Sequence, residues 1–151
     1  MVEKMSAKTY GFAPWMKKAR VFGYARISTE KQSAADKKQT DPMKKPVIKR
    51  QIEEVDDTLK SMGVKKIKAG DWYAEVASGT RRDRPQWLKM IAEAINEKGP
   101  ALVVVKDPSR WARNTRAAVR QADELMMAGV PVFAVSTGLQ TGDDTHGRRP
   151  S

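Results

Sequence analysis

Three polar side chains stand at alternate positions near the end of a short strand-like run. Residues 22–28 read Phe-Gly-Tyr-Ala-Arg-Ile-Ser, so Tyr24, Arg26 and Ser28 are spaced two apart. Successive side chains of an extended chain point to opposite faces, and these three therefore share one face. An arginine beside a hydroxyl group can hold a phosphate against an oxygen nucleophile. The run predicts phosphoryl chemistry, with Ser28 as the candidate nucleophile and Arg26 as a phosphate-binding group.

A second segment with suitable chemistry lies at residues 78–84, Ser-Gly-Thr-Arg-Arg-Asp-Arg, directly before Pro85. Three arginines in a glycine-containing loop ahead of a helix could bind phosphate through their guanidinium groups and through exposed backbone amides. A solvated surface loop is the alternative interpretation of this segment.

A third group of arginines falls on one face of an expected helix over residues 110–128. At about 100° per residue, its four arginines lie within an arc of about 120°. A solvated charged face is the usual explanation of such a pattern. This face carries no acid until its end and begins next to a strand, which favours an anion-binding surface. The arginines are Arg110, Arg113, Arg116 and Arg120.

The composition narrows the chemistry further. The 151 residues include 29 Lys+Arg and 18 Asp+Glu, giving a net charge of +11 and favouring a polyanionic partner. No apolar run approaches ~20 residues, which argues against a membrane partner. The absence of cysteine excludes disulfides and thiolate-ligated zinc and fits a reducing cytoplasm. The single histidine, His146, lies in a polar tail, so neither Ser-His catalysis nor a histidine-ligated metal is expected.

Alternating strands and helices must position these groups. Strands are expected at residues 20–27, 66–73, 101–106 and 130–136. Helices are expected at 46–62, 85–98 and 110–128, with Gly63, Gly99 and Gly129 as their stops. Residues 33–46 are interpreted as a lysine-rich loop, residues 1–19 as a basic extension of doubtful order, and residues 138–151 as a polar, frayed tail. The order predicts an α/β domain with a mostly parallel central sheet and helices on both faces.

The predicted sheet brings the candidate groups together. Ligands of such sheets bind beyond the carboxyl ends of the strands, which places Ser28 and the turn at residues 107–110 on one edge. Asp107 and Glu75 are candidates for a metal-binding pair, but the favoured role of Glu75 is to hold an arginine in place. No carboxylate cluster for two-metal catalysis is evident.

The order of these motifs resembles the catalytic domain of the serine recombinases, the resolvase and invertase family. The resemblance covers residues 20–137 and rests on three blocks in the family's order. They are YARISTEKQ at 24–32, EVASGTRRDRP at 75–85 and KDPSRWARN at 106–114. The resemblance implies a resolvase-like fold.

The resemblance also implies a mechanism. Ser28 would attack a DNA phosphodiester and become joined to the 5′ phosphate, leaving a 3′ hydroxyl, without metal, ATP or other cofactor. Arg26, Arg84, Arg110 and Arg113 match the family's phosphate-binding arginines. Tyr24, Gln32, Gln51, Ser78 and Ser109 match supporting positions, Ser109 standing where many members carry aspartate. The remaining arginines are expected to contact DNA: Arg81, Arg82, Arg116 and Arg120.

The implied partner is DNA, bound through its phosphates in the cytoplasm by a bacterial or phage-encoded protein, with no membrane partner. In the family, dimers pair into a synaptic tetramer before strand exchange. Members continue into a dimerisation helix and a DNA-binding region, so the sequence predicts a catalytic domain without them, from a truncated chain. Two alternatives stay open, namely a non-catalytic DNA-binding remnant of this fold and a metal-dependent nuclease.

Overall fold

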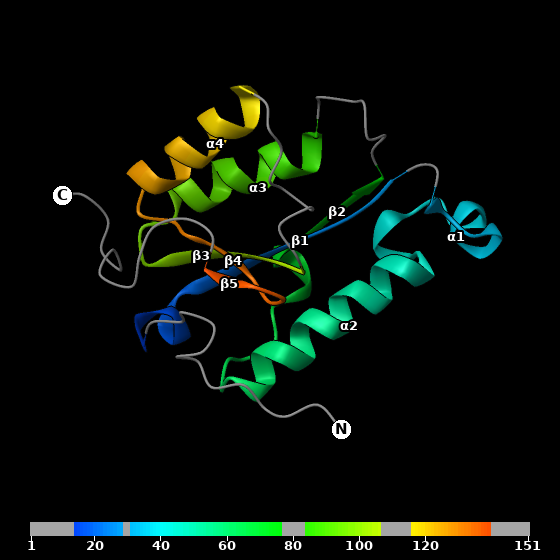
Figure 1. The fold of residues 1–151 in the computed structure, drawn as a ribbon, viewed down its shortest axis with the longest axis horizontal. Helices are drawn as coiled ribbons and strands as arrows, with labels where there is room; N and C mark the ends of the chain where they lie inside the picture. The colour runs from blue at the N-terminus through cyan, green and yellow to red at the C-terminus, as the bar shows by residue number, and fades with distance from the viewer. Residues whose placement is uncertain (1–13, 29–30, 77–83, 107–115, 140–151) are drawn as a thin grey trace.

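The computed structural model describes residues 14–28, 31–76, 84–106 and 116–139, which form a five-stranded sheet with helices on both sides (Figure 1). The sheet has the order β2-β1-β3-β4-β5. The first four strands are parallel, and β5 is antiparallel to β4. The strands are β1 (Arg20–Ile27), β2 (Trp72–Val76), β3 (Ala101–Val105), β4 (Val132–Ala134) and β5 (Gly138–Leu139).

Two hydrophobic cores fill the spaces between the sheet and its helices. Helix α2 (Pro46–Ser61) covers one face, where its Ile48, Val55 and Leu59 are buried against the strands. Helices α3 (Pro85–Asn96) and α4 (Arg116–Met127) cover the other face (Figure 1). The predicted fold class is confirmed. Among the described residues, no helix has the length and apolarity needed to span a membrane.

The central strands follow the sequence pattern closely. All five residues of β3 are buried, as expected for a strand covered on both faces. In β1, Phe22 and Tyr24 enter the core under α3 and α4, whereas Ala25 and Ile27 enter the core under α2. Gly23 stands opposite Trp72 on β2, and a Cβ atom there would lie 2.6 Å from the indole ring. A side chain at this position would therefore clash.

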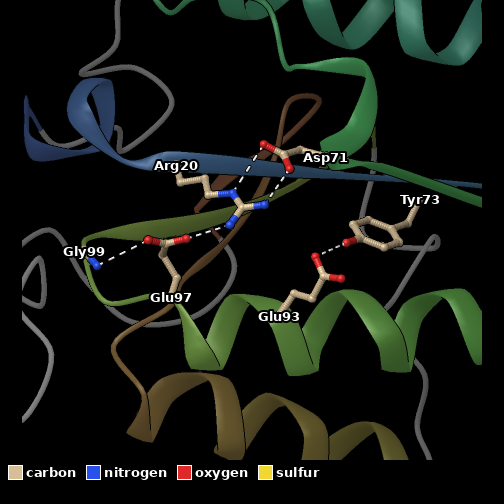
Figure 2. Close-up of polar contacts among 6 residues, drawn as sticks. All are labelled: Arg20, Asp71, Tyr73, Glu93, Glu97 and Gly99. Carbon is tan, nitrogen blue, oxygen red and sulfur yellow. Dashed lines mark hydrogen bonds and ion pairs between the residues drawn. The ribbon is translucent and has the colours of Figure 1, made fainter.

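The amino ends of the strands are joined by an ion-pair cluster (Figure 2). The Arg20 guanidinium donates to Asp71 and to Glu97, at 2.7 Å in each case. On the neighbouring strand, the Tyr73 hydroxyl donates to Glu93 of α3. These contacts tie β1, the start of β2 and the end of α3 together at the edge of the sheet opposite Ser28.

Several predicted boundaries differ from the structure. The second strand begins at Trp72, not at residue 66, because the backbone N–H of Ile67 donates to the Asp56 carboxylate and residues Ala69–Asp71 form a 3-10 turn, η4. The last parallel strand covers only 132–134, and the backbone N–H of Val130 is used by the end of α4. Helix α3 stops at Asn96, without a left-handed Gly99.

Segments interpreted as irregular also contain structure. The expected loop at 33–46 folds into helix α1 (Ala34–Lys38) and a 3-10 turn, η3 (Pro42–Lys44), because side chains cap both. Within the expected extension at 1–19, Pro14–Lys18 form a 3-10 helix, η1, that buries Met16. The expected tail starts with β5. Residues 1–13 and 140–151 lie outside the described residues.

Candidate active site

Ser28 lies directly after β1, at the carboxyl edge of the sheet where it was predicted. Its hydroxyl oxygen is shielded from solvent and makes no hydrogen bond with the residues that the structure describes. Its carbonyl accepts from the backbone N–H of Lys31 at 3.1 Å. The serine is thus held at a strand end with its hydroxyl uncommitted to any described side chain.

The backbone just before Ser28 is fixed by a glutamine from α2. Pairing of β1 with β3 ends at Tyr24, two residues before Arg26. The buried Gln51 side chain accepts from the Arg26 backbone N–H and donates to its carbonyl, both at 3.3 Å. An amide that bonds both groups acts on this residue as a neighbouring strand would. Gln51 therefore supports the predicted site by positioning Arg26, which is itself only 6% exposed.

A buried carboxylate connects β1 to the start of α3. The Tyr24 hydroxyl donates to Glu75 of β2 at 2.5 Å. The same carboxylate accepts from the backbone N–H groups of Gln86 and Trp87, both at 3.2 Å. The Tyr24 ring packs edge-on against Trp87, with the ring centroids 4.9 Å apart. Glu75 therefore holds Tyr24 and the first turn of α3 in one arrangement.

The position of Arg84 depends on this arrangement. Arg84 is the residue before the first turn of α3, where Ser, Thr, Asp or Asn usually caps the helix, and its side chain makes no cap. Glu75 of β2 supplies the missing hydrogen-bond acceptor for α3, and its negative charge suits the positive end of the helix dipole. Arg84 is 7% exposed, so its guanidinium is held inside the protein beside this junction.

The charges around Tyr24 show which groups lie together. Burial raises the pKa of the Tyr24 phenol, and the Glu75 charge and hydrogen bond raise it further. The positive charges of Arg84 and Arg26 act on the same phenol in the opposite direction. Arg26 lies two residues from Tyr24 on the same strand, and Arg84 precedes the turn of α3 that Glu75 caps, so both positive charges act on this phenol. The raised pKa keeps Tyr24 protonated as a hydrogen-bond donor, which suits a positioning role and not a nucleophilic one.

The other predicted residues divide into three groups. Gln32 is half-buried, and its side-chain oxygen makes no hydrogen bond within the described part of the chain. Arg120 is exposed on α4, whereas Arg116 begins that helix. The predicted residues that lie outside the described residues are Ser78, Arg81, Arg82, Ser109, Arg110 and Arg113.

The sequence indicates the role of Glu75 only in part. It predicts Glu75 as a group that holds an arginine in place, or as half of a metal pair with Asp107, which lies outside the described residues, and it does not predict the contacts with Tyr24 and α3. In the described ranges, no three His, Asp or Glu side chains lie close enough together to hold a metal ion. One signal could have found its role as a cap. An Arg-Pro sequence that opens a helix without a local cap requires an acceptor from elsewhere.

A solved structure and a protein family are similar to this chain. The crystal structure of the N-terminal catalytic domain of TP901-1 integrase is similar, with a TM-score of 0.55 and 20% sequence identity. The match covers 77% of this chain and 76% of that one, and it supports the resolvase-like fold. Comparison with curated proteins gave no match. Residues 21–149 match the family described as Resolvase, N terminal domain, and the chain belongs to this family.

Proposed function

We propose that this chain is the catalytic domain of a site-specific serine recombinase, with Ser28 as its nucleophile. Family membership supports recombination of DNA as the activity. The observation that carries the proposal is the burial of Arg26 and Arg84 around Tyr24, at the strand end that leads into Ser28. Two buried guanidiniums at the strand end that leads into the candidate nucleophile suit the binding of a phosphodiester.

In the proposed step, the Ser28 Oγ attacks the phosphorus atom of a DNA phosphodiester. A bond forms between Oγ and phosphorus while the bond from phosphorus to the 3′ oxygen breaks. The serine proton leaves to solvent or a nearby base, and the departing 3′ oxygen takes up a proton. The product is a 5′-phosphoserine ester and a 3′ hydroxyl. Religation reverses these changes at a new 3′ end, so the reaction is a transesterification that needs no external energy source.

The positively charged groups would act on the transition state. Negative charge develops on the nonbridging and leaving oxygens, and donors fixed before reaction stabilise it without reorganisation. Arg26 and Arg84 would supply this stabilisation from the described site. Arg110 and Arg113 are proposed as further phosphate ligands from the block at 106–114. Tyr24, Glu75 and Gln51 would hold the arginines in place through the contacts described above.

The proposed partner is double-stranded DNA, contacted through phosphates by Arg81, Arg82, Arg116 and Arg120 as well. The proposed catalytic unit comprises residues 20–137, and dimers and synaptic tetramers are the proposed working assemblies. Binding through phosphates releases counterions, so affinity should fall steeply as salt concentration rises.

Covalent capture tests the proposal. The chain is incubated with duplexes labelled at either the 3′ or the 5′ end of one strand, and the reaction is quenched with detergent. The 3′-labelled fragment should migrate with protein, and the 5′-labelled fragment should migrate as protein-free DNA. Ser28→Ala should abolish the adduct. The matched control is Ser136→Ala, which changes an exposed serine two residues after β4 and should leave the adduct unchanged.

Two other outcomes would favour the alternatives. Cleavage that EDTA abolishes and that Ser28→Ala leaves intact would indicate a metal-dependent nuclease. The other alternative, a non-catalytic DNA-binding remnant of the fold, is tested with a chimera. In it, residues 20–137 replace the catalytic domain of a family member whose recombination site is known. DNA binding without an adduct in this chimera would indicate a remnant that binds but does not cleave.

A further inference from the structure

A second positively charged surface lies beside the proposed site, and the proposed chemistry does not use it. Residues 31–50 contain seven Lys and Arg side chains and two acids, Asp36 and Asp41. Six of the seven cations are exposed. We call these six the basic platform: Lys31, Lys37, Lys38, Lys44, Lys49 and Arg50.

The two acids of the segment are used to fold it. The buried Asp36 carboxylate accepts from the Ser33 backbone N–H and hydroxyl and from the Val47 backbone N–H. These backbone hydrogen bonds, with that of Val47 first, lower the pKa of Asp36. Asp41 caps η3 by accepting from the backbone N–H of Met43 at 3.0 Å. Both acids therefore act as caps for the local backbone.

The seventh cation, Lys45, is also used internally. It is buried, and its ammonium group donates to the carbonyls of Asp36 and Gln39. This lysine closes the turn between α1 and α2 from the inside. The segment is consequently a folded unit, and its six other cations are carried on its outer surface.

Among the described residues, no ion pair includes a cation of the basic platform, although the exposed Asp41 lies within the segment and the exposed Glu53 lies one turn along α2 from Lys49. Glu54, one turn along α2 from Arg50, pairs with Lys106 at 2.7 Å. In the part of the chain that the structure describes, the exposed large hydrophobic side chains all lie on α3 and α4, and they are Leu88, Met126 and Met127. The platform is therefore cationic without an apolar component, which favours a phosphate backbone over insertion into a lipid surface.

The location of the platform indicates which phosphates it would reach. The segment begins three positions after Ser28, and the Lys31 N–H donates to the Ser28 carbonyl at 3.1 Å. Helix α1 lies beyond the carboxyl end of β1 (Figure 1). Phosphates repeat every ~3.4 Å of helix axis along each DNA strand. A duplex with one phosphate at Ser28 can thus present its next phosphates to this surface.

We infer that the basic platform binds the DNA backbone next to the phosphate that Ser28 attacks, independently of base sequence. This inference rests on the proposed function for its geometry. The platform holds the duplex by charge while Arg26 and Arg84 engage the reacting phosphate. Its ligand is the sugar–phosphate backbone of duplex DNA.

Salt-dependent binding of a mixed-sequence duplex tests the inference. The platform variant is Lys37→Gln, Lys38→Gln, Lys44→Gln. The control variant is Lys65→Gln, Lys68→Gln, Lys98→Gln, which removes three exposed lysines near the amino ends of the strands. Both sets of substitutions are made in the full chain carrying Ser28→Ala, so that covalent attachment to DNA does not contribute to the measured affinity. Unchanged circular dichroism establishes that each variant is folded.

The slope of log affinity against log salt concentration should become less steep by up to about 2.7 in the platform variant, at about 0.9 per lost phosphate contact. The control variant should keep the wild-type slope. Equal changes in both variants would overturn the inference, since they would reflect net charge alone. So would a platform-dependent affinity for phosphatidylserine vesicles without a platform-dependent affinity for DNA. If Ser28 forms the adduct but the platform variant keeps the wild-type slope, this inference is rejected and the proposed function stands.

Discussion

Tyr24 and Tyr73 are register partners on neighbouring strands, yet their hydroxyl groups donate to carboxylates at opposite ends of α3. Tyr24 donates to Glu75, at the start of α3, and feels the charges of Arg84 and Arg26. Tyr73 donates to Glu93, later in α3, and feels the charges of Asp71 and Arg20. The same pair of residue types, tyrosine and glutamate, is thus built into two different electrostatic environments.

The difference lies in the balance of charge and in burial. At the amino end, one guanidinium lies among three carboxylates, and the Arg20 side chain is 42% exposed (Figure 2). At the carboxyl end, the charges that act on Tyr24 are two buried guanidiniums and one buried carboxylate. An end that supplies its own acids suits a structural clamp. An end with buried positive charge suits an anion that arrives from outside.

The largest expected effect separates the arginines of the two ends. Arg26→Lys or Arg84→Lys keeps a positive charge but removes the planar fork that can bind a phosphate bidentately. Adduct formation by Ser28 should fall by about 100-fold or more, as for loss of one fixed donor at a transition state. Arg20→Lys, the matched control, should change the adduct rate by less than about 2-fold and should cost about 1 kcal/mol of stability, a value typical of exposed ion pairs.

Single-turnover adduct formation and urea unfolding measure these effects in the same three variants. The comparison between the two ends would fail if Arg20→Lys slowed the adduct as much as Arg26→Lys did. The comparison would also fail if Arg20→Lys and Arg26→Lys lost stability equally and neither changed the adduct rate.

A smaller effect should separate the two glutamates. The Glu75 carboxylate accepts three hydrogen bonds inside the protein, and Glu75→Gln would direct an NH₂ group at one of these donors. We expect a loss of about 2–3 kcal/mol from the free energy of unfolding, together with slower adduct formation. Glu93→Gln affects a single tyrosine hydrogen bond at an exposed helix position, and should cost less than about 1 kcal/mol.

Urea midpoints measured at constant m-value test this difference. Equal losses in Glu75→Gln and Glu93→Gln would show that the junction between Tyr24 and α3 contributes no more than the surface pair. A large loss in Glu75→Gln with an unchanged adduct rate would make Glu75 purely structural.

The features predicted well from the sequence are those set by local pattern. The continuous apolar run at 101–105 predicted a doubly covered strand, and the alternation of Tyr24, Arg26 and Ser28 predicted their place at a strand end. Pro46 and Gly63 mark the two ends of α2, where Gly63 has a φ of 81°. Each of these signals depends on residues that are adjacent in sequence, so it can be recognised without knowledge of the tertiary structure.

The features that were missed depend on contacts between distant residues. Glu75 caps a helix that starts ten residues later. Gln51 is expected as a supporting residue, but its partner, the Arg26 backbone 25 positions away, was not predicted. The folding of residues 33–46 depends on Lys45 donating back to Asp36 and Gln39, which reverses the usual expectation for a lysine-rich segment. In each case one polar side chain satisfies backbone groups on another element, and sequence spacing does not reveal such partners.

The smallest expected effect concerns the titration of the two tyrosines. Burial, followed by the hydrogen bond to Glu93, raises the pKa of Tyr73 to about 12, against about 10 for an unfolded tyrosine. The neutral phenol is therefore favoured in the folded state. Its stabilisation is complete below pH ~10 and is lost as the pH rises towards ~12. Burial raises the pKa of Tyr24 as well. Its hydroxyl group, which donates to the buried Glu75, therefore stays protonated while the chain stays folded.

Near-ultraviolet phenolate absorbance distinguishes these two residues. The difference between wild type and Tyr73→Phe should titrate with a midpoint near 12, whereas the difference between wild type and Tyr24→Phe should stay flat until the chain unfolds. The unfolding free energy of Tyr73→Phe should also fall less steeply between pH ~10 and ~12 than that of wild type. A Tyr24 midpoint below that of Tyr73 would reverse the comparison, because it would place the more strongly stabilised phenol at the amino end of the sheet.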